Sequence, residues 1–417
     1  MTRLLYSAAY LMALPFIFPG QYRKRQPEGR KLWLRHKTGR LQDRKGDAQL
    51  VWIHAVSVGE VVAAATFIDA FLEKHPGYDI VVSTITDTGR KVAMDKLRGK
   101  ADVIYLPFDI PHFINRAIRA LRPSVFLVME TEIWPNLFHC MNKAGVPMAM
   151  LNGRISERSY NSYKRLGRVL APVLSCVDIF SMQDSTYAAR IIEMGAEPGR
   201  VHNTGSFKFD LRLDRTVIQW AHGLRRPVVV AGSTHRGEEE LIAGVFRDML
   251  SRRAASLVLV PRHPERAPEV EAVLRQNGLT YKLRSAMEDG QGSKGIDVVL
   301  VDTVGELTSI YSEADVVVMG GSFIPHGGQN PLEPAYWGKP VICGPHMDNF
   351  PFIMDFYDND AVLRADASTL MEEIERLLDS EDIRVRVGKR AQDMLSERRG
   401  AINKAVALVE GLMMRDA

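Results

Sequence analysis

Short apolar runs alternate with helix-like segments along most of the chain, and these runs fall into two series. Strands that alternate with helices in this way pair mainly in parallel, as in doubly wound α/β domains. The pattern therefore predicts an α/β protein with two Rossmann-like domains, at residues 49–215 and 216–417. The expected strands are 50–53, 80–83, 103–106, 125–129, 148–151 and 179–182 in the first domain, and 228–231, 257–260, 298–301, 316–319 and 341–343 in the second.

A different pattern occupies residues 1–48, where an uncharged apolar segment from Leu4 to Pro19 precedes a basic run at 22–45. As a helix, the apolar segment would reach about 24 Å, which is short of the roughly 30 Å hydrocarbon core of a bilayer. Positive residues beside such a segment stay on the cytoplasmic side and attract anionic lipids. We therefore expect a membrane anchor that lies in or half-enters the membrane, followed by a basic juxtamembrane segment. A cleaved secretory signal and an ordinary buried helix are the alternative interpretations.

Composition adds limits to this picture. The 417 residues are 46% apolar, which is enough for two cores, and the net charge is only +4. Because the basic run alone carries +8, the remainder is acidic, and a nucleic-acid-binding surface is not expected. Three cysteines without a CxxC pair argue against a disulfide framework. Asp358-Asn359-Asp360 spells a DxD motif, but no apolar strand leads into it, so we interpret it as a polar turn and expect no metal.

The stretch from Met319 to Phe350 carries the most chemical information. It joins a β-branched strand to a turn with four glycines, and then to a helix predicted to begin with Asn330 as its N-cap. Pro331 suits the first helical position, and Glu333 completes a capping-box spacing. The free N–H groups of such a turn and helix start favour a phosphate. The segment therefore predicts a phosphate-binding turn in a doubly wound domain.

Polar segments directly follow seven of the expected strands. Open α/β sheets bind ligands at the carboxyl ends of their strands, so these segments predict a ligand cleft to which both domains contribute. They are 57–60, 130–132, 152–156, 233–235, 262–263, 302–306 and the segment that begins at 322.

Some of these residues admit two interpretations. Glu60 stands three residues after Ser57, which is a capping-box spacing, and a carboxylate in that place could also act as a general base. Glu333 could likewise stabilise a helix start or bind a ligand. Arg262 and His263 lie between two prolines, so they could form a stiff loop or grip a phosphate or carboxylate, because a guanidinium binds such groups in bidentate fashion.

Several motifs together resemble the 3-deoxy-D-manno-octulosonic acid (Kdo) transferases, the enzymes that attach Kdo to the lipid A precursor. The glycine-rich segment GGSFIPHGGQNPLEPA at 320–335 is accompanied by HAVSVGE at 54–60, METEIWPN at 129–136, GSFKFD at 205–210, STH at 233–235 and PRHPER at 261–266. The resemblance covers nearly the whole chain. It implies a GT-B fold, in which two Rossmann-like domains face a cleft and the last helix crosses back to the N-terminal domain.

The resemblance also assigns roles to residues. Glu60 would be the catalytic base and Glu333 would bind the ribose of the donor, whereas Lys208 could contact an anion or remain a solvated lysine. No metal or other cofactor is implied. The acceptor side would comprise Glu130, Glu132 and Arg154, and the donor-binding set would be Lys208, Ser233, Thr234, His235, Arg262, His263, Ser322, Gly327, Gly328, Asn330 and Glu333.

The implied activity is the inverting transfer of Kdo from cytidine monophosphate-Kdo (CMP-Kdo) to the lipid A precursor, lipid IVA, at the cytoplasmic face of the bacterial inner membrane. The partners would be CMP-Kdo, this lipid and the anionic inner leaflet, without nucleic acid. A UDP-sugar-dependent GT-B enzyme, either a lipid-linked N-acetylglucosaminyltransferase or a 2-epimerase, is the first alternative. A non-catalytic lipid-surface protein of the same fold is the second.

Overall fold

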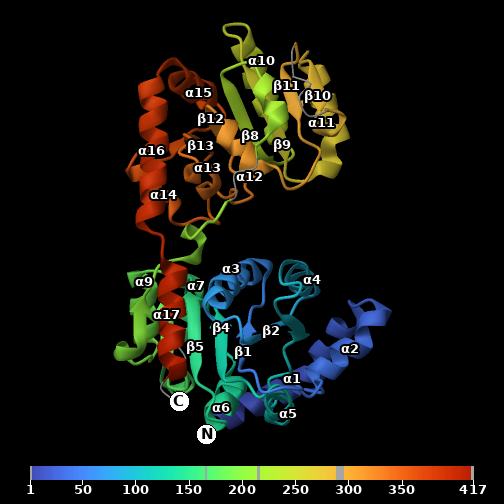
Figure 1. Cartoon of the computed structure of the whole chain (residues 1–417), viewed down its shortest axis with the longest axis vertical. Coiled ribbons are helices and arrows are strands. Elements are labelled where there is room, and N and C mark those ends of the chain that lie inside the picture. The colour runs from blue at the N-terminus through green and yellow to red at the C-terminus, as the bar shows by residue number, and fades with distance from the viewer. Residues whose placement is uncertain (1, 165–166, 214–216, 288–294, 415–417) are drawn as a thin grey trace. The chain divides into compact units, whose positions relative to one another are not determined.

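The computed structural model describes residues 2–164, 167–213, 217–287 and 295–414 (Figure 1). The chain divides into two compact α/β units, Met1–Asp210 with Arg399–Ala417, and Leu211–Arg398. The first division falls at 210/211, where the sequence predicted 215/216, and the last helix belongs to the first unit. Each unit contains one parallel sheet, as the predicted fold class requires.

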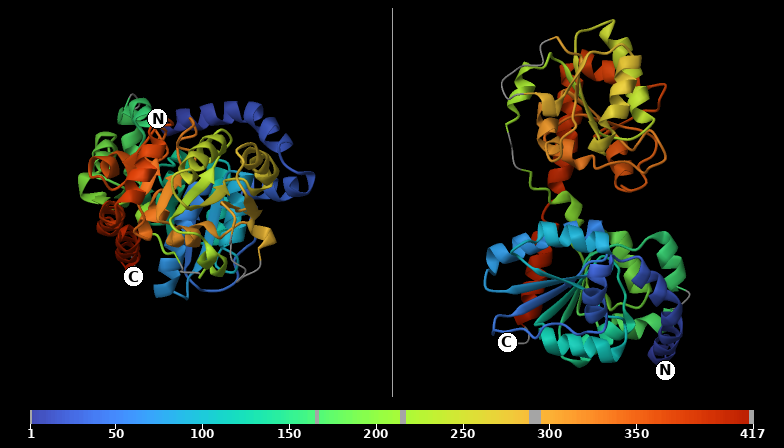
Figure 2. Two further views of the ribbon diagram at one scale, coloured as in Figure 1. Left: turned by 90° about the horizontal axis from the view of Figure 1, so that it is seen from above. Right: turned by 90° about the vertical axis from the view of Figure 1, so that its right-hand side faces the viewer.

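The first unit is built on a seven-stranded sheet in the order β3-β2-β1-β4-β5-β6-β7, with parallel pairing throughout. Parallel sheets are covered by helices on both faces, and Figure 2 shows helices on both faces of this one. The strands are β1 (Leu50–His54), β2 (Asp79–Thr84), β3 (Asp102–Tyr105), β4 (Val125–Met129), β5 (Met148–Gly153), β6 (Ile179–Met182) and β7 (Val201–Asn203). The helices around this sheet are α3 (Val58–Lys74), α4 (Asp87–Lys96), α5 (Pro111–Leu121), α6 (Pro135–Lys143), α7 (Glu157–Lys164), α8 (Gly167–Leu174), α9 (Ser185–Glu193) and α17 (Ala401–Met413).

Alternate strand residues build separate cores on the two faces of this sheet. Trp52 and Phe126 lie in one core, with their rings edge to face at 5.5 Å, and side chains of α5 and α6 complete it. Val51 and Ile53 lie in the other core, together with α3 and with α17 residues such as Val409. The last helix therefore buries an apolar face that the first unit needs.

One carboxylate fastens this returning helix. Asp210, at the end of the first pass of the chain through this unit, accepts hydrogen bonds from the N–H groups of Gly400 and Ile402. These groups lie at the start of α17, where the N–H groups of a helix have no partner within the helix. The chain leaves the first unit after Asp210 and re-enters it at Arg399, and these hydrogen bonds join the two points.

The second unit contains a seven-stranded parallel sheet in the order β10-β11-β9-β8-β12-β13-β14. All eleven predicted strands are present in the two sheets, whereas the short edge or near-edge strands β7, β10 and β14 were not predicted. The strands of this unit are β8 (Val228–Thr234), β9 (Ser256–Pro261), β10 (Tyr281–Leu283), β11 (Val298–Leu300), β12 (Val316–Met319), β13 (Val341–Cys343) and β14 (Leu363–Arg364). The helices are α10 (Glu238–Leu250), α11 (Ala267–Gln276), α12 (Leu307–Ile310), α13 (Leu332–Tyr336), α14 (Ile353–Asp358), α15 (Leu370–Asp379) and α16 (Glu381–Glu397).

The apolar N-terminal segment forms α1 (Thr2–Arg23), and α2 (Pro27–Lys37) follows it. One face of α1 carries Tyr10, Leu14 and Phe18, which pack against a cluster around Trp33 and Phe108. Since one face is docked in this way, α1 lies along the surface of the first unit. The large apolar side chains on its exposed face are Leu4, Leu5, Leu11, Met12, Phe16 and Ile17.

Candidate active site

Glu60 lies in the first turn of α3, directly after β1. Its N–H donates to Ser57 Oγ at 3.2 Å, and its carboxylate accepts the N–H groups of Val56 at 2.8 Å and Ser57 at 3.2 Å. The predicted capping box is therefore confirmed. Each carboxylate oxygen can accept a second hydrogen bond, so the capping role leaves capacity for a ligand hydroxyl. The two interpretations of Glu60 are thus compatible.

Glu130 follows β4 and forms an ion pair with Arg154, whose Nε lies 3.1 Å from Glu130 Oε2. Burial raises the pKa of Glu130; the positive charges of Arg154 and Lys208 oppose this rise, and the negative charge of Glu60 adds to it. Lys208 is exposed between two buried phenylalanines in a 3₁₀ turn at Phe207–Phe209. The structure therefore brings Glu60, Glu130, Arg154 and Lys208 within electrostatic reach of one another.

Glu132 is the most perturbed carboxyl of this group. Burial, followed by the negative charges of Glu60 and Glu130, raises its pKa to about 7, and a hydrogen bond from Trp134 Nε1 at 3.1 Å opposes the rise. Perturbed carboxyls of this kind concentrate at functional sites, because burial and like charges are unfavourable for stability alone. Glu130 and Glu132 thus lie within electrostatic reach of Glu60, and Arg154 pairs with Glu130.

Three residues with a left-handed backbone lie at strand ends that carry candidate site residues. Glu130 has φ 54° after β4, Asn152 has φ 55° in β5, and Ser233 has φ 57° in β8. Side chains other than glycine rarely adopt this conformation, and its strain is characteristic of functional sites. Asn152 also accepts the N–H of Phe207 at 3.1 Å, which fixes the turn that presents Lys208.

In the second unit, Thr234 and His235, which follow Ser233 at the end of β8, have different environments. Thr234 is fully buried and donates its hydroxyl to Glu239 at 3.1 Å, so it stabilises the turn. His235 lies beside His326, with ring centroids 4.0 Å apart. Burial, then the charges of His326 and His263, lower the pKa of His235 to about 4, so this ring is neutral at pH 7.

Arg262 and His263 are exposed immediately after β9. The Arg262 N–H donates to the carbonyl of Thr234 at 2.9 Å, which holds this loop against the end of β8. Burial raises the pKa of Glu333, and both a hydrogen bond from Asn330 and the charge of Arg262 oppose the rise. The donor candidates Arg262 and Glu333, although distant in sequence, are therefore electrostatic neighbours.

At the start of the glycine-rich segment, the polar groups of Gly321 and Ser322 form hydrogen bonds within the protein. Ser322 is completely buried; its hydroxyl donates to the carbonyl of Met319 at 2.5 Å and accepts the N–H of Gly344 at 2.7 Å. The N–H groups of Gly321 and Ser322 donate to the carboxylate of Glu238. Ser322 therefore shapes the turn, and its polar atoms are used there.

The backbone conformation at Gly327 and Gly328 favours glycine, and a Cβ atom at either position would press on a neighbouring side chain. Their φ values are 95° and 79°, and a Cβ atom would lie 2.5 Å from Asn349 Nδ2 at Gly327 and 2.2 Å from Met347 Sδ at Gly328. The N–H of Gly328 donates to the carbonyl of Gly321 at 2.7 Å, which closes the loop on itself. Positive φ values of this size are adopted readily by glycine and rarely by other residues.

The predicted helix start after this loop was wrong in detail. The helix α13 begins at Leu332 with Pro331 as its N-cap, one residue later than expected. Asn330 Oδ1 accepts the N–H of Leu332 at 3.2 Å, so Asn330 forms a local turn that displaces the helix start. Its contact with Glu333 runs from Nδ2 to Oε1 at 3.4 Å, and not in the capping-box sense. A five-residue helix contributes little dipole, so the loop itself must supply the chemistry.

Two residues of this region were not singled out by the sequence. Gln329 places its side-chain Nε2 3.2 Å from His235 Nε2. Glu238 is completely buried beneath the glycine-rich segment. Both residues lie in polar segments in or beside the recognised motifs. The spacing of residues along the chain does not show which loops contact each other in the fold.

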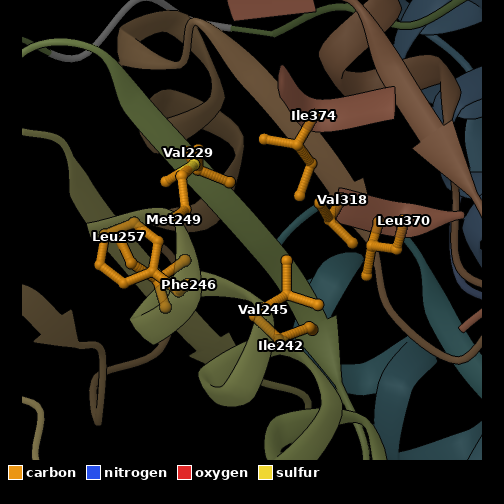
Figure 3. Close-up of a pocket in the computed structure, with 9 residues that line it drawn as sticks. All are labelled: Val229, Ile242, Val245, Phe246, Met249, Leu257, Val318, Leu370 and Ile374. Carbon is orange, nitrogen blue, oxygen red and sulfur yellow. The ribbon is translucent and has the colours of Figure 1, made fainter. Parts of the chain in front are cut away.

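Two other features of the second unit, a small cavity and the DxD segment, are explained by packing and by local structure. A cavity of about 10 Å³ between α10, α15 and the sheet is lined only by hydrocarbon and thioether side chains, which makes it a packing gap (Figure 3). Asp358 ends α14 and Asp360 pairs with Arg390 at 3.2 Å, so the DxD segment is the polar turn that we predicted. Within the described residues, no cluster of metal-binding side chains was found.

Each unit collects polar groups at the strand ends of its own sheet. The first unit presents three carboxyl groups beside two cations, which suits proton acceptance and the recognition of a charged, hydroxylated ligand. The second presents a glycine-rich loop, an exposed guanidinium and a half-buried carboxyl, which suits an anionic group joined to a sugar.

The chain is similar to known proteins in sequence and in fold. Residues 33–211 match the family model for 3-deoxy-D-manno-octulosonic-acid transferase (kdotransferase). A 3-deoxy-D-manno-octulosonic acid transferase from Haemophilus influenzae is 33% identical over 436 aligned residues, covering 100% of both chains. The C-terminal CMP-Kdo binding domain of a protein from Acinetobacter baumannii is 34% identical, over 42% of this chain and 92% of that domain, with a TM-score of 0.39.

A glycosyltransferase from Rickettsia africae shares the fold, with a TM-score of 0.55 and 11% identity over 88% of this chain and 99% of that one. This likeness shows the GT-B fold, which is built from two parallel-sheet α/β domains such as the two units described above. The sequence match over the full length is more specific. The chain therefore belongs to the 3-deoxy-D-manno-octulosonic acid transferase family and is a glycosyltransferase.

Proposed function

We propose that the protein transfers Kdo from CMP-Kdo to the lipid A precursor with inversion at the anomeric carbon. The observation that carries this proposal is the position of Glu60, held by the N–H groups of Val56 and Ser57 beside Glu130 and Glu132. The acceptor hydroxyl oxygen bonds to the anomeric carbon as the bond from that carbon to the CMP phosphate breaks. The hydroxyl proton passes to Glu60, and CMP departs with the electron pair.

The second unit would bind the donor. Arg262 is placed to neutralise the negative charge that develops on CMP, and Glu333 to accept hydrogen bonds from the ribose hydroxyls. The N–H groups of Gly327, Gln329 and Asn330 would bind the phosphate. Charge neutralisation by these groups replaces a metal ion in this proposal.

The acceptor would reach the enzyme at the cytoplasmic face of the inner membrane. The exposed apolar face of α1 and the basic residues that follow it suit an in-plane contact with anionic lipid. Although residues 3–23 are long and apolar enough to span a bilayer, the packing of Tyr10, Leu14 and Phe18 on the domain favours the in-plane arrangement.

The direct test supplies purified protein with CMP-Kdo and lipid IVA and determines the product mass. Addition of one or more Kdo residues is expected, at the same rate with and without EDTA. Loss of activity in EDTA, restored by magnesium, would contradict the metal-independent mechanism. Calorimetry with CMP and UDP tests the alternative of a UDP-sugar enzyme, because that enzyme would bind UDP in preference to CMP.

Replacement of the ribose-binding carboxyl gives a separate prediction. Glu333→Ala is expected to raise the donor KM roughly tenfold with little change in kcat, because the lost contact is to the ribose and not to the reacting carbon. Steady-state kinetics with varied CMP-Kdo provide the measurement, and exposed Glu372→Ala in the same unit is the matched control. Unchanged donor affinity with a lower melting temperature would assign Glu333 to helix stability alone.

Membrane attachment can be tested without disturbing the packed face of α1. Phe16 is 86% exposed, and Phe16→Glu is expected to weaken binding to anionic vesicles roughly tenfold, because it removes a large apolar side chain from the lipid and adds a charge. Val304→Glu in the second unit, also 86% exposed, is the control and should bind as the parent does. Equal cosedimentation of both variants would show that α1 is not the contact.

A further inference from the structure

The carboxylate of Glu238 has an unusual environment for a group with no exposure to solvent. Its Oε2 accepts the N–H groups of His235 at 2.9 Å and Gly321 at 2.7 Å. Its Oε1 accepts those of Ser322 at 3.0 Å and Phe323 at 2.9 Å. Four backbone donors from two loops therefore converge on one side chain at the start of α10.

Successive N–H groups that point to one place after a strand form a nest that binds anions. In the segment after β12 this nest is filled by the protein's own carboxylate, so it offers no donors to a ligand. The second half of the segment differs. Within the described part of the chain, the N–H groups of Gly327, Gln329 and Asn330 donate to no protein acceptor. The glycine-rich segment is thus divided into an occupied half and an open half, in which Gly328 alone of these four residues donates its N–H within the described protein.

We infer that Glu238 is a positioning residue for donor binding, which fixes the loops after β8 and β12 so that the open half at 327–330 receives the phosphate. The inference rests on the proposed function in taking that phosphate to be the donor's. Glu238 acts through two connections. It holds the N–H of His235, whose ring contacts His326 and the Gln329 side chain, and it holds Gly321, whose carbonyl accepts the N–H of Gly328.

The backbone around the Glu238 carboxylate is closely packed. A Cβ atom on Gly320 would lie 2.2 Å from the carbonyl oxygen of Ser233, so the two loops are in direct backbone contact beside the carboxylate. Ser233 itself has φ 57°. A neutral amide at position 238 would turn an NH₂ group toward backbone N–H donors, which removes acceptors and sets donor against donor.

The test measures donor affinity and stability separately in the full-length protein. Glu238→Gln is expected to weaken CMP binding at least tenfold by calorimetry and to raise the donor KM in proportion, while the acceptor KM stays within twofold. Glu240→Gln is the matched control, since Glu240 is exposed at the same helix start and accepts the N–H of Gly237 at 3.0 Å. It should bind CMP as the parent does.

A purely structural role gives a different result. If Glu238→Gln lowers the melting temperature but its folded form binds CMP and uses the donor within twofold of the parent, the inference is overturned. Glu238→Asp keeps the charge but is one methylene shorter, and it is assayed in the same way. If the amide variant does not fold, the CMP affinity of Glu238→Asp decides between a positioning role and a purely structural role. If the parent binds UDP instead of CMP, the proposed donor fails, and the same loss of affinity, measured with UDP, still tests Glu238.

Discussion

Glu60→Gln is expected to reduce transfer by about 10²–10⁴-fold, the range in which general-base catalysis contributes to rate. The amide keeps one oxygen for the cap but cannot accept the acceptor's proton. CMP binding should remain within twofold of the parent, because no donor-binding residue is changed. Product formation with CMP-Kdo and lipid IVA, measured beside CMP calorimetry, separates the two properties.

The cap itself needs a control, because Glu60 also stabilises the start of α3. Ser57→Ala removes the hydroxyl that accepts the Glu60 N–H but leaves the carboxylate in place. It should cost about 1 kcal/mol of stability, as lost N-caps do, with transfer within tenfold of the parent. If Ser57→Ala lost as much activity as Glu60→Gln, capping and not proton transfer would explain both variants.

Glu132→Gln is expected to raise the free energy of unfolding by about 2 kcal/mol at pH 8 and by less than about 1 kcal/mol at pH 5. The folded-state pKa of about 7 lies above the ordinary value of 4.5, so the folded protein holds this proton more tightly than the unfolded chain. Stability is therefore lost as pH rises from 4.5 through 7, and an uncharged amide avoids the loss. For a fully buried carboxyl, a pKa rise of this size would correspond to about 3 kcal/mol of lost stability. Because Glu132 is partly exposed, solvent screening reduces the expected loss to about 2 kcal/mol.

Urea unfolding at the two pH values measures this difference. Glu157→Gln is the matched control, since Glu157 is an exposed glutamate of the same unit and should give the same change at both pH values. An equal effect of Glu132→Gln at pH 5 and pH 8 would contradict the raised pKa. A carboxyl that lowers stability at neutral pH is consistent with a group retained for the reaction.

The strand pattern was readable from the sequence because buried parallel strands are continuous apolar runs. The runs at 125–129, 179–182, 316–319 and 341–343 coincide with β4, β6, β12 and β13. The short strands β7, β10 and β14 were missed, because their two or three residues lie at or near sheet edges and include polar side chains such as His202 and Lys282. Sheet order and the return of α17 depended on contacts between distant segments.

Local spacing also predicted the Glu60 capping box, because its partners lie within four residues. It misplaced the start of α13, since the Asn330 side chain took the N–H of Leu332. Residues such as Ser322 and Thr234 were recognised as motif members, but their hydroxyls are used inside the protein. A motif identifies residue types, whereas only the fold shows which polar atoms already have partners.

The sequence by itself determined the α/β class, the two units, the family and the strand ends at which site residues collect, because each depends on residue type and short-range order. The tertiary structure decided how α1 packs, which carboxyls surround Glu60, and which N–H groups of the glycine-rich segment stay open. Those properties arise when loops distant in sequence meet and compete for hydrogen bonds and for solvent. Glu238, more than 80 residues before the turn that it holds, belongs to this second class.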